Sequence, residues 1–323
     1  MMDIITVGEL LIDLTQTHMD ENGIRHYAAN PGGAPANVAV AAARLGASAG
    51  FIGKVGADTY GDDLRAVLRR NGVEISGLFE TDQAPTTQAV VSVGARGERT
   101  FSFYRSPGAD LFLTKEEAVS ALTEAPRVLH FGSVSLAAEP ARSATLAAVK
   151  RAKELGALVS YDPNYRANLW PDRETALSMM KKPLSMADIL KISDEELPLF
   201  TGTDDPEEGS RILTEFGISL VLVTLGGDGT FYRFGDMTGR VPAFSVQIAD
   251  TNGAGDTFFG AFLRCIVSRG DSPLDGLSPE ELYRIIRFSN CAAALTCSRS
   301  GAIPAMPTLA EVEAFAGQQN SEE

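Results

Sequence analysis

The sequence has few of the residues that build disulfide frameworks or histidine-based metal centres. It contains three cysteines and three histidines in 323 residues. Two of the cysteines lie in apolar helical runs, so buried reduced thiols are expected rather than disulfides. His18, His26 and His130 lack the spacing of metal ligands. These shortages argue against a disulfide-stapled secreted domain and against a histidine-ligated metal enzyme.

Positive charge and long apolar runs are also scarce. There are 28 lysines and arginines against 42 aspartates and glutamates, which gives a net charge of −14. Such a surface argues against non-specific binding to nucleic acid or anionic membranes. There is no charged-then-apolar leader and no apolar run long enough to span a bilayer. The sequence therefore predicts a soluble, cytoplasmic protein with neither nucleic acid nor membrane as a partner.

The chain has enough apolar residues, 44% of the total, for a large core. Short buried-looking runs alternate with helical patterns through most of its length, which predicts an α/β fold with a doubly wound, mainly parallel sheet flanked by helices. We expect a single domain over residues 1–323. The expected strands are Ile4–Val7, Phe51–Val55, Val128–Phe131, Leu158–Tyr161, Ile189–Ile192 and Leu220–Leu225, and the last helix is expected at Ile285–Thr296.

Two hairpins interrupt this alternation, at about residues 13–30 and 88–105, the second around a turn at residues 94–97. Strands inserted into such a fold often form a flap over the active site. We expect a small β-sheet lid built from segments at about 13–32 and 86–107. A small sheet with one apolar face is poorly stable alone, which predicts a homodimer through the lid.

The glycine-rich loop at residues 250–256 (DTNGAGD) lies between a strand-like run, Phe244–Ile248, and an apolar helical run that begins at Thr257. Gly253 and Gly255 let the backbone approach a ligand, and the first N–H groups of a helix attract anions. Asp256 fits either an N-cap or a base beside a bound anion.

A second glycine loop, residues 30–37, precedes a helix of small apolar residues, so another backbone is expected to pack closely on that helix. Asn37 is a polar residue on this buried-looking helix and is expected to be hydrogen-bonded. Three further polar or glycine-rich segments follow strands, where α/β sheets bind ligands: residues 162–166, 193–196 and 226–229.

The motifs at residues 31–37 (PGGAPAN) and 250–256, about 220 residues apart, resemble the two motifs of the ribokinase-like (PfkB) sugar-kinase family. Residues 103–110 (FYRSPGAD), 131–135 (FGSVS), 162–166 (DPNYR) and 191–196 (KISDEE) resemble fructokinases most closely. The resemblance implies a ribokinase-like fold and ATP-dependent phosphorylation, with Mg²⁺, of a ketose hydroxymethyl group, D-fructose giving fructose 6-phosphate.

The resemblance also implies roles for individual residues. Asp256 corresponds to the general base, and the N–H groups of Gly253, Ala254 and Gly255 to an anion hole. Sugar contacts are implied for Asp13, Gly32, Gly33 and Asn37, with Tyr104, Arg105 and Arg166 as further candidates. ATP contacts are implied for Ser193, Glu196, Thr224, Gly226, Gly229 and Asn290, and Glu196 would also organise Mg²⁺ through water.

A monovalent cation such as K⁺ would be held, mostly through backbone carbonyls, by Asp250, Asn252, Thr296, Arg299 and Gly301. Two departures bear on these assignments. Ser193 occupies the first position of the family's Asn-x-x-Glu motif, and Ala305 stands where ribokinases carry a hydroxyl. Potassium activation stays open on this ground.

Three other functions are considered for this sequence. Arg105 and Arg166 can pair with a carboxylate, which suits a 2-keto-3-deoxygluconate kinase. A non-catalytic sugar or nucleotide sensor on the same scaffold is disfavoured by Asp256, because a sensor needs no base. A dinucleotide-dependent oxidoreductase would need Gly-x-Gly-x-x-Gly after the first strand, and residues 8–13 (GELLID) lack it.

Overall fold

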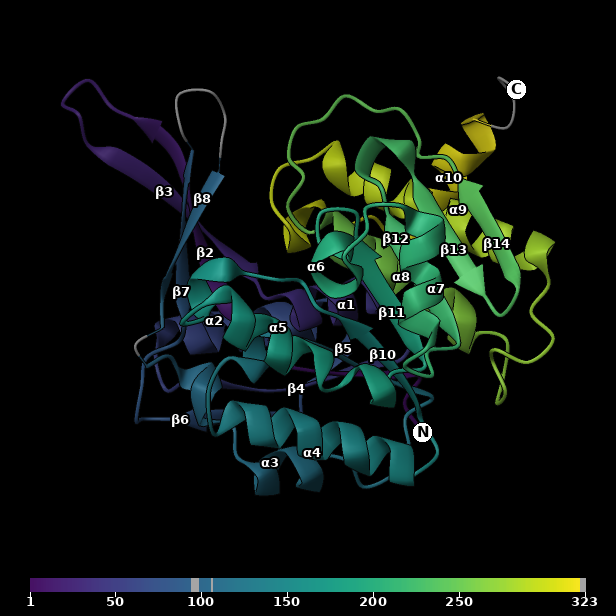
Figure 1. Ribbon diagram of the computed structural model, residues 1–323. Helices are drawn as coiled ribbons and strands as arrows, with labels where there is room; N and C mark the ends of the chain where they lie inside the picture. Colours follow the sequence, from purple (N-terminus) through teal and green to yellow (C-terminus); the bar gives the residue numbers. More distant parts are fainter. Residues whose placement is uncertain (94–98, 106, 320–323) are drawn as a thin grey trace.

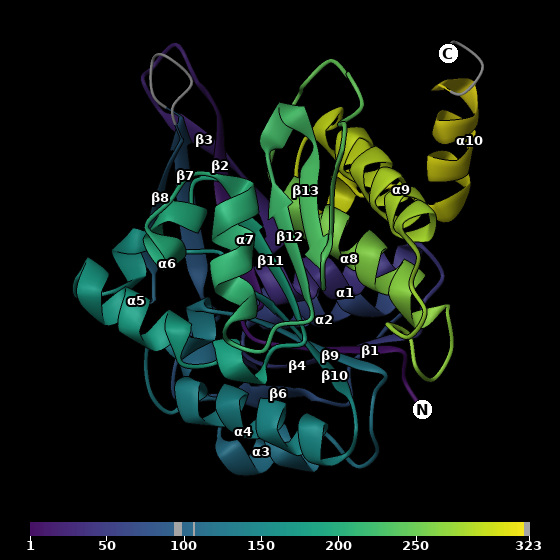
Figure 2. The same cartoon turned by 45° about the vertical axis from the view of Figure 1, so that its right-hand side comes forward.

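The computed structural model describes residues 1–93, 99–105 and 107–319. A ten-stranded sheet forms its centre, in the order β14-β13-β12-β11-β10-β9-β1-β4-β5, with β6 paired to β4 (Figures 1 and 2). Its strands are β1 (Ile4–Val7), β4 (Ala49–Gly56), β5 (Val73–Glu74), β6 (Leu78–Thr81), β9 (Val128–Gly132), β10 (Leu158–Asp162), β11 (Ile189–Ser193), β12 (Leu220–Thr224), β13 (Thr230–Phe234) and β14 (Met237–Val241).

The sheet is mainly parallel, as expected. Every pair in it is parallel except β12 with β13 and β13 with β14. These last two strands form a hairpin that the sequence analysis missed, although the two-residue turn Gly235-Asp236 between apolar runs is a hairpin signal. Because the other strands run the same way, the polar segments that follow them meet at one edge of the sheet.

Helices cover both faces of the sheet. Helices α1, α2, α8 and α9 share one apolar core with Ile4, Val128 and Leu222, and α3 to α7 share the other with Val7, Phe131 and Val223. The helices are α1 (Ala34–Arg44), α2 (Thr59–Arg70), α3 (Lys115–Ser120), α4 (Ala141–Glu154), α5 (Arg173–Lys181), α6 (Leu197–Thr201), α7 (Pro206–Thr214), α8 (Ala254–Val267), α9 (Pro279–Cys297) and α10 (Leu309–Gln319).

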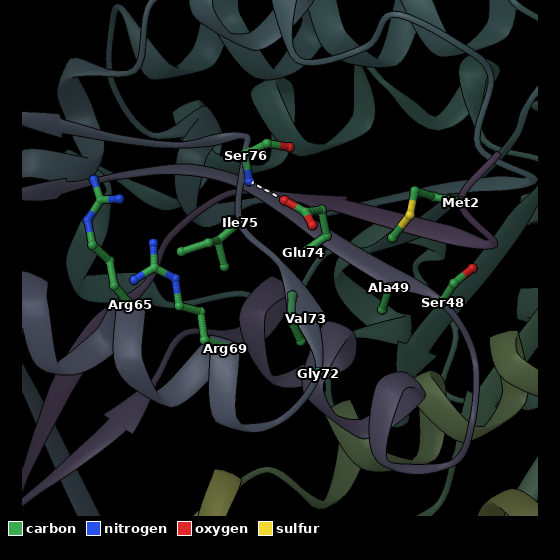
Figure 3. Close-up of a pocket in the computed structure, with 10 residues that line it drawn as sticks. All are labelled: Met2, Ser48, Ala49, Arg65, Arg69, Gly72, Val73, Glu74, Ile75 and Ser76. Carbon is green, nitrogen blue, oxygen red and sulfur yellow. Dashed lines mark hydrogen bonds between the residues drawn. The ribbon is translucent and has the colours of Figure 1, made fainter.

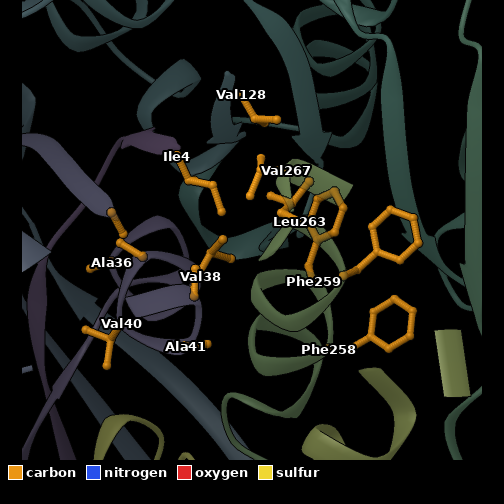
Figure 4. Packing of buried hydrophobic residues seen from close by; sticks show 14 of the residues in the cluster. Ile4, Ala36, Val38, Val40, Ala41, Val128, Phe258, Phe259, Leu263 and Val267 are labelled. Carbon is orange, nitrogen blue, oxygen red and sulfur yellow. The ribbon is translucent and has the colours of Figure 1, made fainter. Parts of the chain in front are cut away.

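The contact between α1 and α8 explains the small residues of α1. A Cβ added to Gly260 of α8 would lie 2.7 Å from both the side chain of Ala41 and the carbonyl oxygen of Val38. The two helices therefore pack almost backbone to backbone, as the sequence predicted for α1. Figure 4 shows Val38 and Ala41 facing Phe259 and Leu263, with Ile4 and Val128 of the sheet beside them.

A separate four-stranded sheet, in the order β3-β2-β7-β8, forms the predicted lid. Its strands are β2 (Leu11–Met19), β3 (Arg25–Gly32), β7 (Gln88–Val93) and β8 (Arg99–Tyr104). The two hairpins project together from the body of the molecule (Figure 1), joined by the parallel pairing of β2 with β7. The predicted turn at residues 94–97 lies outside the described residues.

Two predicted elements were wrong. Residues 244–248 pair with no strand of the described chain; Phe244 instead packs against Phe315 of α10, and Ile248 is exposed. Phe244 is therefore apolar because it packs against a helix and not because it belongs to a sheet. The last helix is α10 rather than 285–296, and α9 begins earlier, at Pro279, with Ser278 as its N-cap.

No helix in the described part of the chain is both long and apolar enough to cross a bilayer.

Candidate active site

The loop at residues 250–256 opens helix α8. Gly253 is its N-cap and has a φ of 76°, in the left-handed region that favours glycine. A side chain there would also collide with Ala302, 2.9 Å from the added Cβ. The turn thus brings the backbone of residues 253–255 to the surface of the site, where the first N–H groups of α8 have no helical acceptor. This arrangement can bind an anionic group.

Asp256 lies in the first turn of α8 and is half-buried between two elements far apart in the sequence. Its Oδ2 accepts a hydrogen bond of 2.8 Å from Nδ2 of Asn37 on α1. Burial raises the pKa of Asp256 to about 6, and Asp162 adds to this, while Asn37, Lys191 and Arg166 oppose it. A carboxylate with a pKa near that of the medium is suited to accepting a proton from a hydroxyl.

A narrow cleft opens above Asp256 and contains most of the predicted sugar contacts. Gly32 lies against it, since a Cβ there would collide with Oδ2 of Asp13. Gly33 has a φ of 111°, and its Cβ would lie 2.4 Å from the carbonyl oxygen of Glu9, so only glycine fits the turn. The residues lining the cleft are Glu9, Leu11, Asp13, Gly33, Ala34, Asn37, Phe103, Val134, Asn164, Arg166, Asn252 and Asp256.

Asp13 reaches the cleft from lid strand β2. Burial raises its pKa to about 6; a hydrogen bond from Asn252 and the charge of Arg166 oppose the rise, and Asp256 and Asp250 add to it. The lid therefore contributes the carboxylate of Asp13 to the cleft, and the body contributes that of Asp256. The charge of Arg166 lowers the pKa of both. Such a site can accept hydrogen bonds from several hydroxyls.

Two of the further sugar candidates lie elsewhere. Tyr104 is 66% exposed and pairs with Gln88 on the face of the lid opposite Asp13, whereas its neighbour Phe103 lines the cleft. Side chains alternate along a strand, so only one of the two can face the sugar within a single chain. Arg105 is buried and is paired with Asp110 through Nε, at 2.8 Å, and through a second nitrogen.

Glu9 is a site residue that the sequence analysis missed. It follows β1, and its Oε1 accepts a 3.0 Å hydrogen bond from the backbone N–H of Ala34 at the start of α1. Its Oε2 is buried and has no hydrogen-bond partner among the described residues. Burial raises the pKa of Glu9 to about 7. A lone acidic residue after a strand carries no signal of this burial, which arises from the docking of α1.

The predicted nucleotide contacts follow β11 and β12. Ser193 and Thr224 are direct partners across these two strands, and Gly226 and Gly229 bound the following turn with φ values of 54° and 92°. Asn290, on α9, is already engaged: it accepts from Thr230 and donates to the carbonyl oxygens of Val241 and Pro242.

Glu196 fits a role toward a metal through water better than direct ligation. Its Oε1 accepts from the backbone of Tyr165, and its Oε2 from the backbone and hydroxyl of Ser193, each at 3.0 Å. Within the described ranges, no three acidic, histidine or cysteine side chains are grouped so as to hold an ion directly.

The structure brings together part of the predicted monovalent-cation loop. Asp250 accepts from the backbone N–H groups of Asn252, at 2.8 Å, and of Gly301, at 3.1 Å. Thr296 lies nearby on α9 and donates to the carbonyl oxygen of Ala292. The side chain of Arg299 is paired with Glu311 of α10.

A larger cavity, of about 620 Å³, lies at the opposite end of the strands (Figure 3). It is bounded by Met2 before β1, Ala49 at the start of β4 and Glu74 of β5, with Arg65 and Arg69 of α2 beside it. None of the predicted site residues lines this cavity.

The chain is similar to known carbohydrate kinases over nearly its whole length. Residues 1–309 match the family described as pfkB family carbohydrate kinase. Fructokinase-1 of Oryza sativa subsp. japonica is 46% identical over 312 residues, covering 96% of each chain. The ATP-bound fructokinase of Xylella fastidiosa superposes with a TM-score of 0.90 at 35% identity, over 99% of this chain and all of that one. A fructokinase double mutant from Vibrio cholerae O395, with fructose, ADP and potassium bound, gives 0.86 at 33% identity, over 97% and 98%.

Proposed function

The chain belongs to the pfkB family of carbohydrate kinases, and from this premise we propose that it is an ATP-dependent fructokinase. It acts as a single kinase domain that transfers the terminal phosphoryl group of ATP to the 6-hydroxyl of D-fructose. The observation that carries the proposal is the contact of Asp256 with Asn37 at the mouth of the α8 turn.

Asp256 is the general base. The attacking hydroxyl of the sugar loses its proton to the carboxylate of Asp256 as its oxygen bonds to phosphorus and the bond to the leaving ADP oxygen breaks. The N–H groups of Gly253, Ala254 and Gly255 would stabilise the charge of the transferred group, that of Ala254 by leaving its 3.3 Å hydrogen bond to the carbonyl oxygen of Thr251. Phosphoryl transfer needs positioning and charge neutralisation, and these residues supply both.

The cleft suits a neutral sugar. Asp13 and Asn37 can hydrogen-bond to hydroxyls, whereas a carboxylate beside Asp13 would be repelled in a site of low dielectric constant. Arg105 cannot serve as one half of a clamp for a sugar acid while its guanidinium is paired with Asp110 inside the protein. Fructose is therefore favoured over 2-keto-3-deoxygluconate.

ATP is expected against Ser193, Thr224 and the turn from Gly226 to Gly229, at the ends of β11 and β12. Mg²⁺, bound with ATP, would neutralise phosphate charge. Glu196 would orient water around it, because both of its oxygens are fixed by protein donors. We also place K⁺ at the loop of Asp250 and Gly301, next to the anion hole.

A homodimer through the lid is part of the proposal. The exposed apolar side chains Met19, Ile24, Tyr27 and Tyr104 all belong to the two lid hairpins. Tyr27 and Tyr104 lie on the face opposite Asp13, where a second copy can cover them without closing the cleft.

The three cysteines are free thiols, which suits the reducing cytoplasm.

The experiment is a panel assay of ATP consumption with fructose, 2-keto-3-deoxygluconate, ribose and adenosine. We expect kcat/KM for fructose to exceed that for ketodeoxygluconate at least about tenfold, or ~1.4 kcal/mol. Asp256→Asn serves as the inactive control. Binding of fructose without turnover of any of the four compounds would instead indicate a sugar sensor.

One observation favours the second candidate, a 2-keto-3-deoxygluconate kinase. Arg166 lies in the cleft itself, and an arginine there can bind a carboxylate. A preference for ketodeoxygluconate in the panel, lost in Arg166→Ala, would establish that activity in place of fructokinase.

A further inference from the structure

A buried ion pair lies beside the turn that opens α8. Nζ of Lys191, near the end of β11, donates to Oδ2 of Asp162, at the end of β10, over 2.8 Å. The two side chains are 8% and 3% exposed. Both lie in segments that resemble fructokinases, residues 162–166 and 191–196, but the resemblance gave neither residue a role of its own.

The ammonium group of Lys191 lies beside the predicted anion hole. A Cβ added to Gly255 would lie 3.1 Å from Nζ and 3.6 Å from Cε of Lys191. A larger residue at position 255 would therefore crowd the end of the lysine side chain. The cation is thus next to the turn whose N–H groups are proposed to bind the transferred phosphoryl group.

Lys191 stays charged in this position. Burial lowers its pKa, but the charges of Asp162, Glu196 and Asp256 outweigh burial, and the net shift is upward. It lies within the field of the base and of the glutamate proposed to organise Mg²⁺. The cation is thus close enough to Asp256 and Glu196 to interact with the charges of both.

A second buried ion pair, Lys54 with Glu117, lies away from the site and serves as a structural comparison. Lys54 of β4 is as buried as Lys191, at 7%. It contacts both carboxylate oxygens of Glu117, at 2.7 and 2.8 Å, and the carbonyl oxygen of Phe112. Asp162, by contrast, keeps a buried Oδ1 without a partner, and Lys191 has one acceptor among the described residues. Buried pairs add stability only when fully satisfied, so a role beyond packing is indicated.

We propose that Lys191 is a further catalytic residue, whose ammonium group, held by Asp162 against Gly255, contacts the phosphoryl group during transfer. The inference rests on the proposed function. The transferred group carries its charge on three oxygens, and a fixed cation in a dry site stabilises that charge without rearranging. Arriving phosphate oxygens would take up the ammonium donors that Asp162 leaves unused.

The test compares Lys191→Met with Lys54→Met, two variants that lose a lysine of equal burial. Both are expected to lower Tm. Only Lys191→Met is expected to lower kcat, by about 10²-fold or more, with KM for fructose changed less than about threefold. Equal kcat in the two variants would overturn the proposal.

Binding gives a second readout that does not depend on turnover. Aluminium fluoride with ADP and Mg²⁺ mimics the phosphoryl group during transfer. In the presence of fructose, wild type should therefore bind ADP more tightly when aluminium fluoride is added. Lys191→Met should keep its affinity for ADP and lose that gain. A gain as large as that of wild type would show that the ammonium does not touch the group.

Two more variants cover the case in which Lys191→Met does not fold. Asp162→Asn keeps the ammonium group, whereas Asp162→Asn with Lys191→Met removes both charges and leaves none buried and unpaired. The first should retain the fluoride-dependent gain and the second should lose it; the same gain in both would contradict the proposal. Failure of wild type to phosphorylate fructose would overturn the substrate assignment alone, and the comparison is then made with the sugar that the panel identifies.

Discussion

Nδ2 of Asn37 and Oδ2 of Asp256 are joined by a hydrogen bond of 2.8 Å across 219 residues of sequence. The bond is possible because α1 and α8 pack closely at Gly260, which brings their N-terminal ends to one place. Asn37 also fixes the orientation of the carboxylate and favours its ionised form. The packing of α1 on α8 therefore also determines the orientation and ionisation of the base.

Asp256→Asn should abolish most activity. The amide keeps the shape of the side chain but cannot accept the proton of the sugar. We expect kcat to fall by roughly 10²-fold or more, with a modest change in sugar affinity. Steady-state kinetics and fructose titration measure the two effects. A variant with near-native turnover would exclude Asp256 as the base.

Activity should fall in acid as Asp256 takes up a proton. Its pKa is about 6 in the protein, so kcat/KM should decline about tenfold per pH unit below that value. The charged groups that act on it are Asp13, Asp162, Arg166 and Lys191. Asn37→Ala removes a bond to the ionised form and should move the acid limb to higher pH.

A control for that assignment comes from Asp13, which titrates in the same range. Asp13→Asn should weaken fructose binding and retain an acid limb in kcat/KM, because Asp256 still titrates. If the limb disappears in this variant, the titration belongs to Asp13 and not to the base.

Glu9 should make the protein less stable as the pH rises. Its pKa is about 7 when folded against 4.5 as the ordinary value, so the folded state binds more protons between these values and the free energy of unfolding falls across that window. Relative to Glu9→Gln, wild type should lose roughly 2–3 kcal/mol between about pH 5 and about pH 8. Urea denaturation at both pH values measures the change.

Glu311→Gln is the matched control. Hydrogen bonds from Thr308 and Arg299 lower the pKa of Glu311 to about 2, below the range tested. Its difference from wild type should stay constant over the same range. A constant difference for Glu9→Gln as well would mean that Glu9 is not the group that titrates.

Arg166→Ala should weaken fructose and ketodeoxygluconate to a similar degree, because a neutral sugar meets the arginine only through hydroxyls. The comparison is made with kcat/KM for each sugar. A selective loss for ketodeoxygluconate, together with a wild-type preference for it, would exclude the fructokinase assignment.

The lid should hold two chains together. Light scattering at micromolar concentration is expected to give the mass of a dimer. Tyr27→Ser combined with Tyr104→Ser removes two exposed aromatic rings from the outer lid face and should shift the equilibrium toward monomer. Tyr283→Ser, on α9, is a control with a comparably exposed ring. A monomeric wild type at this concentration would exclude the interface.

Much of the fold could be read from local patterns. The buried run Ile4–Val7 matches β1 at both ends, and the alternation of the two hairpins predicted the lid. The same reasoning was wrong at Phe244, because an apolar residue that packs on a helix looks the same in sequence as one inside a sheet. Tertiary packing determines whether such a residue lies against a helix or inside a sheet, and the local sequence does not indicate which.

The site divides in the same way. Glycine motifs and Asp256 are recognisable because backbone geometry restricts the residue type. Glu9, Phe103 and Lys191 were missed because their importance comes from what folds over them: the start of α1, the pleat of the lid and the turn at Gly255. A period-2 pattern anchored on Asp13 would have favoured Phe103 over Tyr104.

The 219 residues between Asn37 and Asp256 also set an order of events during synthesis. A ribosome adding about 5–20 residues per second adds Asn37 roughly ten to forty seconds before it adds the base, Asp256. Until then α1 has no Gly260 to pack against, and its small apolar face stays uncovered. A chain that stops before α8 therefore carries parts of the sugar site and of the expected ATP contacts but lacks the base, so premature termination yields a protein that cannot transfer the phosphoryl group.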